Sequence, residues 1–144
     1  MIDCMTDKIY PRSAREMMDG WVHLPRFIDK IRLQVAGKLH PEYAENFTQG
    51  FDGQWLKAAG VDADQFIKVV RSTVSDGEVC DWVRVNVKKS AAEKNAFNQF
   101  VLNRGADDEQ AKARLEQRKR DNNLAHRTDV RTFVDMIDAD EKRT

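Results

Sequence analysis

Pairs of helix-capping residues recur along the chain, and they constrain the fold more than any other feature of the sequence. In each pair a Ser or Asp is followed three residues later by Glu or Gln: Ser13 and Glu16, Asp62 and Gln65, Ser75 and Glu78, Ser90 and Glu93. The first side chain accepts a hydrogen bond from an unpaired amide of the first turn, and the second reaches back to the amide of the cap. Three glycines follow helical patterns, where a left-handed residue closes the last turn: Gly37, Gly60 and Gly105.

Between these signals the apolar residues recur with the period of an α-helix. The stripes are Leu24, Phe27, Ile28, Ile31 and Val35; Phe51, Trp55, Leu56 and Ala59; Phe66, Ile67, Val70 and Val74; Val79, Trp82 and Val83; Ala96, Phe97, Phe100 and Val101; and Val130, Phe133, Val134 and Ile137. Residues 82–87 alternate apolar and polar side chains as a strand does, but no partner strand is visible, so we interpret them as helix. The sequence predicts an all-α fold, a single helical domain over residues 1–144 with six or seven helices.

Some segments carry weaker signals. Residues 40–53 are the longest stretch without regular periodicity, and residues 107–124 contain strong helix formers but almost no apolar stripe, which predicts a solvated helix. Asp135 and Asp138 are predicted on the exposed side of the last helix. They lack the glycine turn and ligand order of a calcium loop.

Charge disfavours a nucleic-acid partner. The chain has 24 Lys and Arg against 24 Asp and Glu, whereas proteins that bind nucleic acid usually show a basic excess or a basic face. Residues 63–87 could form a helix-turn-helix, but its second helix begins with Asp76, Glu78 and Asp81, which phosphates would repel.

Other classes are disfavoured by what the sequence lacks. Cys4 and Cys80 are read as free thiols, with Cys80 in the core, in a reducing compartment. No apolar run is long enough for a membrane span and no signal peptide is visible, so we expect a cytoplasmic protein. The three histidines are isolated, and no glycine-rich phosphate loop occurs, so we expect no metal and no cofactor.

Residues 10–32 hold the one candidate site in the sequence. The candidates for anion binding are Arg12, Arg15, Arg26 and Arg32, and the candidates for an acid, base or orienting role are His23 and Asp29. Arginine binds carboxylate or phosphate through two parallel hydrogen bonds, and the helix opened by Pro25 offers a positive N-terminus. The alternative is structural: Arg12 or Arg15 pairs with Asp19 or Asp29 and ties the N-terminal arm to the body. Because Asp29 lies opposite the apolar stripe, we predict that the arm covers it and supplies its arginine partner.

Four segments of the chain, in this order, resemble an uncharacterised family of small bacterial proteins, a domain of unknown function: YPRSAREMMDGWVHLPRFIDKIRLQVAGKL, GVDADQFIKVV, SDGEVCDWV and RTDVRTFVDMIDADEKR. The resemblance covers the chain from about Pro11 to its C-terminus. It implies a compact bacterial domain, and it carries over no catalytic residue because the family has no established reaction or ligand. The motif positions are Arg12, Ser13, Arg15, Leu24, Pro25, Arg26, Asp29, Lys30, Arg32, Arg127, Thr128 and Asp129.

Three functions follow as hypotheses. The leading one is a small cytoplasmic binding or interaction module with a protein partner. The alternative is a small enzyme or binder of an anionic metabolite, which would need a concave pocket holding at least two of the arginines and a titratable group. The weakest is a nucleic-acid-associated factor.

Overall fold

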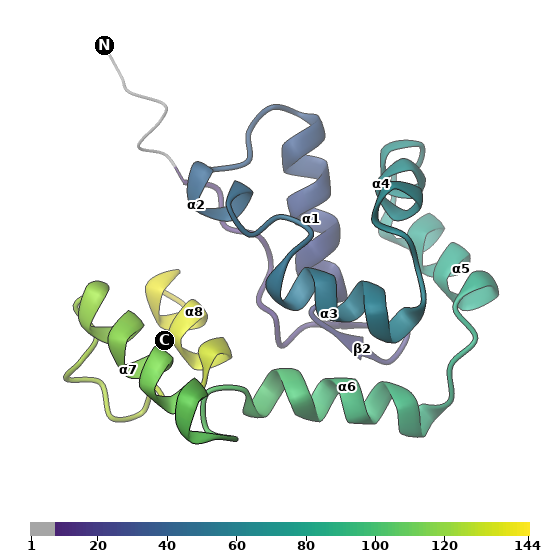
Figure 1. Ribbon diagram of the computed structural model, residues 1–144. Helices are drawn as coiled ribbons and strands as arrows, with labels where there is room; N and C mark the ends of the chain where they lie inside the picture. The colour runs from purple at the N-terminus through teal and green to yellow at the C-terminus, as the bar shows by residue number, and fades with distance from the viewer. Residues whose placement is uncertain (1–7) are drawn as a thin grey trace, which may run out of the picture. The chain divides into compact units, whose positions relative to one another are not determined.

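The computed structural model describes residues 8–144, which form eight helices and one short hairpin (Figure 1). The hairpin pairs β1 (Met17–Met18) with β2 (Trp21–Val22), antiparallel. The helices are α1 (Leu24–Val35), α2 (Pro41–Ala44), α3 (Gly50–Ala59), α4 (Ala63–Arg71), α5 (Asp76–Asn86), α6 (Ala91–Asn103), α7 (Glu109–Asp121) and α8 (Phe133–Asp140). The all-α prediction is confirmed, and residues 82–86, whose pattern suggested a strand, belong to α5.

The predicted number of helices was too low. Residues 40–53, predicted to be irregular, contain the single turn of α2 and the start of α3. The side chain of His40 caps α2 by accepting a hydrogen bond from the Glu42 amide at 3.2 Å. A helix of one turn is too short to show an apolar period, which is why the pattern missed it.

The chain divides into two compact units, one ending at Asn95 and the other comprising Ala96–Thr144. In the first, α1 packs against α3 and α4, and α4 packs against α5; Figure 1 shows α1 and α4 side by side. Aromatic rings fill the space between them: Trp55 lies 4.8 Å from Phe66 and 6.1 Å from Phe27, centroid to centroid. The prediction of a single domain is not tested by this division and stays a prediction.

The second unit packs α7 against α8. Its core consists of Leu115, Val130, Met136 and Ala139, with Leu124, Phe133 and Ile137 against them. The solvated helix predicted over 107–124 is α7, and the residues that it buries are Ala111, Leu115 and Lys119. Gly105 is held at φ 107° with the Thr132 Cα only 3.1 Å from where a Cβ would stand, so a side chain there would clash with backbone.

Three of the four predicted capping pairs begin a helix, two of them with both predicted hydrogen bonds and the pair of Asp62 and Gln65 with the first alone. Ser75 and Glu78 make a full capping box, Ser90 and Glu93 bond reciprocally, and Asp62 accepts from the Gln65 amide at 3.2 Å. The fourth pair is wrong as a helix start. Ser13 Oγ accepts from the amide of Arg15 instead, and the chain turns into the hairpin through Asp19 and Gly20, both at positive φ.

Three side-chain placements also differ from the sequence predictions. Val74 lies beyond the end of α4 and is 86% exposed, because the helix stops at Arg71. Cys80 is half-buried rather than in the core, and Arg84 donates to its Sγ at 3.6 Å. Asp138 is buried rather than exposed, and its carbonyl accepts from the Arg143 amide where α8 ends. Cys4 lies outside the described residues.

Within residues 8–144, every helix is too short or too polar to cross a lipid bilayer.

Candidate functional site

Three of the six predicted site residues, Arg12, His23 and Asp29, take part in two polar networks around α1. The first, which we call the buried cluster, consists of His23, Lys30 and Asp52 and joins α1 to α3. The second, the arm network, consists of Arg12, Asp29 and Asp76 and joins the N-terminal arm (residues 10–16) to α1 and α5. Both networks lie in the first compact unit.

The buried cluster centres on the Asp52 carboxylate, which is fully buried. Its Oδ1 lies 2.6 Å from His23 Nε2, and its Oδ2 lies 2.7 Å from Lys30 Nζ. The Thr48 amide donates to Oδ2 as well, at 3.1 Å. Both oxygens of this buried carboxylate therefore accept hydrogen bonds, as a charge in an apolar interior requires.

Local sequence explains how these groups meet. His23 is the N-cap residue of α1 with φ 73°, a left-handed conformation that costs energy in a residue with a Cβ. Lys30 follows His23 by seven residues, two turns of helix, and so lies on the same face. Asp52 is in the first turn of α3. Gly53 beside it allows a close approach, since a Cβ there would meet the Thr48 carbonyl at 3.0 Å.

Burial sets the protonation of this cluster. Burial lowers the pKa of His23, against the opposing effect of Asp52. For Asp52 burial acts to raise the pKa, but the His23 hydrogen bond and the Lys30 charge outweigh it and hold the pKa below its ordinary value. A neutral His23 therefore donates Nε2–H to a charged Asp52, which leaves Nδ1 without a proton. Among the described residues Nδ1 has no hydrogen-bond partner.

The arm network is organised by Arg12. Its Nε and one terminal nitrogen donate to the two oxygens of Asp29, each at 2.9 Å, and its other terminal nitrogen donates to Asp76 at 2.7 Å. The Arg12 amide also donates to Asp29 at 2.9 Å. The hydrogen bond to Asp29 raises the pKa of Arg12 above its ordinary value. The predicted pairing of Asp29 with an arginine of the arm is confirmed.

The other predicted arginines lie in different surroundings. Arg26 is buried, donates to the Arg12 carbonyl at 3.1 Å and stacks over the Tyr43 ring. Arg32 donates to the Val74 carbonyl at 2.9 Å and lies 3.9 Å from Asp76. Arg15 is exposed. The fold thus brings Arg12 and Arg32 to one carboxylate, Asp76, and it places His23 in the buried cluster with Asp52.

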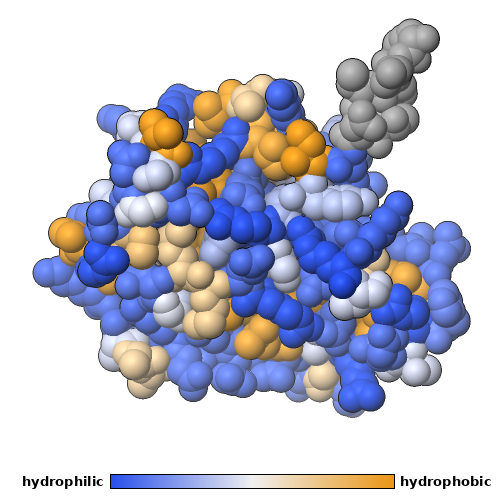
Figure 2. Space-filling view, turned by 180° about the vertical axis from the view of Figure 1, so that it is seen from behind, coloured by the Kyte–Doolittle hydropathy of each residue, from blue (hydrophilic) through white to orange (hydrophobic). Residues whose placement is uncertain are grey.

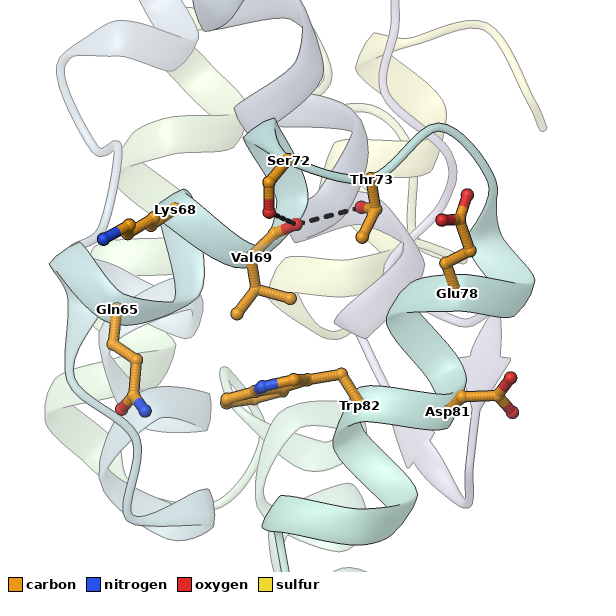
Figure 3. A pocket seen from close by; sticks show the side chains of 8 residues that line it. All are labelled: Gln65, Lys68, Val69, Ser72, Thr73, Glu78, Asp81 and Trp82. Atoms are coloured by element: carbon orange, nitrogen blue, oxygen red, sulfur yellow. Dashed lines mark hydrogen bonds between the residues drawn. The ribbon is translucent and has the colours of Figure 1, made fainter.

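A groove between α4 and α5 is a separate feature, with a volume of about 560 Å³. Figure 3 shows the Trp82 ring lying across the groove from the Val69 side chain, with Gln65 and Lys68 on the α4 side and Glu78 and Asp81 on the α5 side. Ser72 and Thr73 hydroxyls both donate to the Val69 carbonyl, at 3.1 and 3.0 Å. None of the four predicted arginines lines it.

Sequence reasoning missed Asp52, Lys30 and this groove. Asp52 lies 29 residues from His23, and no local pattern relates the two. The signal for the groove was present but was read differently: Trp82 was assigned to an apolar stripe of the core, although its neighbours Asp81 and Glu78 are charged.

These features define an all-α protein with a polar arm packed on α1 and an open groove between α4 and α5. A family model described as a domain of unknown function (DUF5069) matches residues 8–143, and the chain belongs to this family. A search among curated proteins finds no match.

Proposed function

We propose that the chain is a binding module that takes up a protein partner in the groove between α4 and α5, and that it is not an enzyme. The observation that carries this proposal is the half-buried Trp82, which faces Val69 across an open groove and leaves an aromatic surface accessible. Tryptophan is enriched where protein surfaces bind one another, because it buries a large area at a small cost in conformational entropy.

The contacts of the arginines argue against the small-anion alternative. An anion clamp presents guanidinium groups to a ligand, yet Arg12 already donates to two carboxylates, and Arg26 and Arg32 each donate to a backbone carbonyl. His23, the candidate acid or base, is 2% exposed and is bonded to Asp52. A substrate would have to displace these groups before any chemistry could begin.

The proposal is tested by photo-crosslinking in cells. A photo-crosslinking amino acid replaces Gln65, which is exposed and lines the groove, and in a matched control it replaces Gln117, an exposed glutamine of α7. We expect a covalent adduct with a protein from position 65 and none from position 117. Equal adducts from both positions, or none from position 65, would contradict the proposal.

A second measurement addresses the alternative. If the arginines await a small anion, millimolar phosphate or a dicarboxylate raises the melting temperature of the parent protein above that in chloride of matched ionic strength. The rise would be absent from Arg12→Ala or Arg15→Ala. A binding module of the kind proposed shows no such specific rise.

A further inference from the structure

We infer that the partner in this groove is a second copy of the chain, so that two copies associate about a two-fold axis running between α4 and α5. This inference rests on the proposed function, because it names the occupant of the same groove. The main evidence for the inference is the charge on the two rims of the groove.

The two rims of the groove have opposite charge. Lys68 and Arg71 are in the last turn of α4, three residues apart and therefore on neighbouring positions of its surface. Glu78 and Asp81 lie on α5, likewise three residues apart, and both line the groove. Glu78 also accepts hydrogen bonds from the Val74 and Ser75 amides, and Asp81 accepts one from Arg84 at 2.6 Å, so each keeps only part of its carboxylate for a partner. All four side chains are exposed. In Figure 3 the Lys68 side chain points outward from α4 and the Asp81 side chain points outward from α5, on opposite sides of the view.

Such a surface is complementary to itself. In an interface with two-fold symmetry, residue i of one copy contacts residue j of the other, and j contacts i in return. An axis between the rims places the basic α4 rim of each copy against the acidic α5 rim of the other. A partner with a single sign of charge would instead be repelled by one of the two rims.

Apolar side chains accompany the charges. Val74, at 86% exposed, and Val85, at 65%, are the most exposed large hydrophobic residues in the described part of the chain. Val74 immediately precedes the cap of α5, and its amide donates to Glu78. Val85 follows Trp82 by one turn. Figure 2 shows one face of the molecule, on which hydrophobic residues form patches among hydrophilic ones. The proposed interface between two copies therefore combines apolar side chains with charged rims.

The size of the surface sets the expected affinity. With 9 and 11 residues, α4 and α5 are roughly 14 and 17 Å long. Two such helices side by side offer less than the ~800 Å² per partner of a standard interface. We therefore expect a weak dimer, with a dissociation constant in the micromolar range or above, where the weakest standard-size interfaces lie.

Sedimentation equilibrium of the full chain between about 5 and 500 μM tests the inference. We expect a monomer–dimer equilibrium for the parent and a weakening of at least about 30-fold for Trp82→Ala, which removes an aromatic hot spot from both copies. The matched control, Val35→Ala, removes an exposed valine of α1 and should leave the equilibrium unchanged. A monomer at all concentrations would overturn the inference.

Charge reversal provides a test that does not disturb packing, which matters because Trp82 also lies 6.1 Å from the Phe66 ring. Lys68→Glu and Asp81→Lys should each weaken self-association by about tenfold, since each places like charges across the interface twice. An equimolar mixture of the two variants should associate again, because both cross-interface pairs are then of opposite sign. Failure of the mixture to associate would overturn the two-fold arrangement.

The crosslinking experiment separates this inference from the proposed function. An adduct of position 65 with twice the mass of the chain supports the second copy. An adduct of another mass leaves the proposed function standing and overturns the inference. No adduct overturns both.

Discussion

The buried cluster and the arm network both involve α1 and have charged contacts of similar length, yet their surroundings differ. Their shortest charged contacts are 2.7 Å from Lys30 to Asp52 and 2.7 Å from Arg12 to Asp76. The Asp52 side chain is fully buried, whereas the Asp29 and Asp76 side chains retain 25% and 44% of their exposure. The contact distances therefore do not predict which network contributes more to stability, whereas the exposure of its side chains to water does.

The reason lies in what replaces a lost partner. A carboxylate near the surface that loses its arginine is rehydrated, and the pair is worth little beyond its hydrogen bonds. A buried ammonium that loses its carboxylate finds no water, and it must either lose its proton or bear the cost of desolvation. The two networks thus connect elements of the same unit with very different tolerance of substitution.

The largest effect is expected from Asp52→Ala. The substitution leaves the Lys30 ammonium, the His23 Nε2–H and the Thr48 amide without their acceptor inside the core. We expect the free energy of unfolding to fall by about 3–5 kcal/mol, as when one partner of a buried ion pair is removed. Urea denaturation followed by far-ultraviolet circular dichroism measures it.

Two variants sharpen this prediction. Asp52→Asn keeps the shape and one acceptor oxygen, so it should cost less than Asp52→Ala. The double variant Asp52→Leu with Lys30→Met removes both charges and should recover most of the loss, because neither partner is then left unpaired. A double variant as unstable as Asp52→Ala would show that the charges are not the cause.

A smaller effect is expected from Asp29→Ala. Asp29 accepts from the Arg12 side chain and amide, but Arg12 retains Asp76 and partial access to water. We expect a loss of about 1–3 kcal/mol, the cost of leaving partly buried donors unpaired. The melting temperature and the urea midpoint of the variant measure it.

The control for Asp29 is the pair of Arg127 and Asp129, whose contact is 2.7 Å against 2.9 Å for Arg12 and Asp29, and whose Asp129 side chain is 64% exposed. Asp129→Ala should change stability too little to measure, although the bond to Arg127 lowers the pKa of Asp129 to about 2. If Asp129→Ala and Asp29→Ala lower the free energy of unfolding by the same amount, the partial burial of Asp29 contributes nothing to stability.

The sequence predicted the arm network better than the buried cluster, for a physical reason. The pairing of Asp29 with the arm followed from helix geometry, because a carboxylate opposite an apolar stripe is covered only if another segment reaches it. Asp52 meets His23 only because α3 crosses the N-terminus of α1 and His23 adopts a left-handed backbone. Neither condition can be predicted from the spacing of residues along the chain. The helix caps were predictable because each cap joins residues that are no more than four positions apart in the sequence.

The failures have the same origin. Ser13 and Glu16 have the spacing of a capping box, but the turn at Asp19 and Gly20 ends any helix there, and tertiary pairing of the arm overrides the local signal. Trp82 fits an apolar stripe, yet only the distance between α4 and α5 decides whether it faces the core or an open groove. Spacing in the sequence does not contain that distance.

The smallest effect is expected from pH, and it separates the two networks by their titration. Because burial lowers the pKa of His23 in the folded chain, unfolding allows the imidazole to bind a proton below its ordinary value of 6.5. The unfolded state then holds more protons, so stability decreases as the pH falls below about 6.5, by less than about 1 kcal/mol between pH 7 and 6. Asp52 contributes in the same direction only in strong acid: its stabilisation is present above pH 3.8, its ordinary pKa, and is lost as the pH falls through its lowered folded pKa.

His23→Gln retains a donor for Asp52 but cannot titrate, so its urea midpoint should change less between pH 7.5 and 5.5 than that of the parent. His126→Gln, at an exposed histidine, should follow the parent. A parent and a His23→Gln variant with the same dependence on pH would show that His23 is not held neutral by the fold.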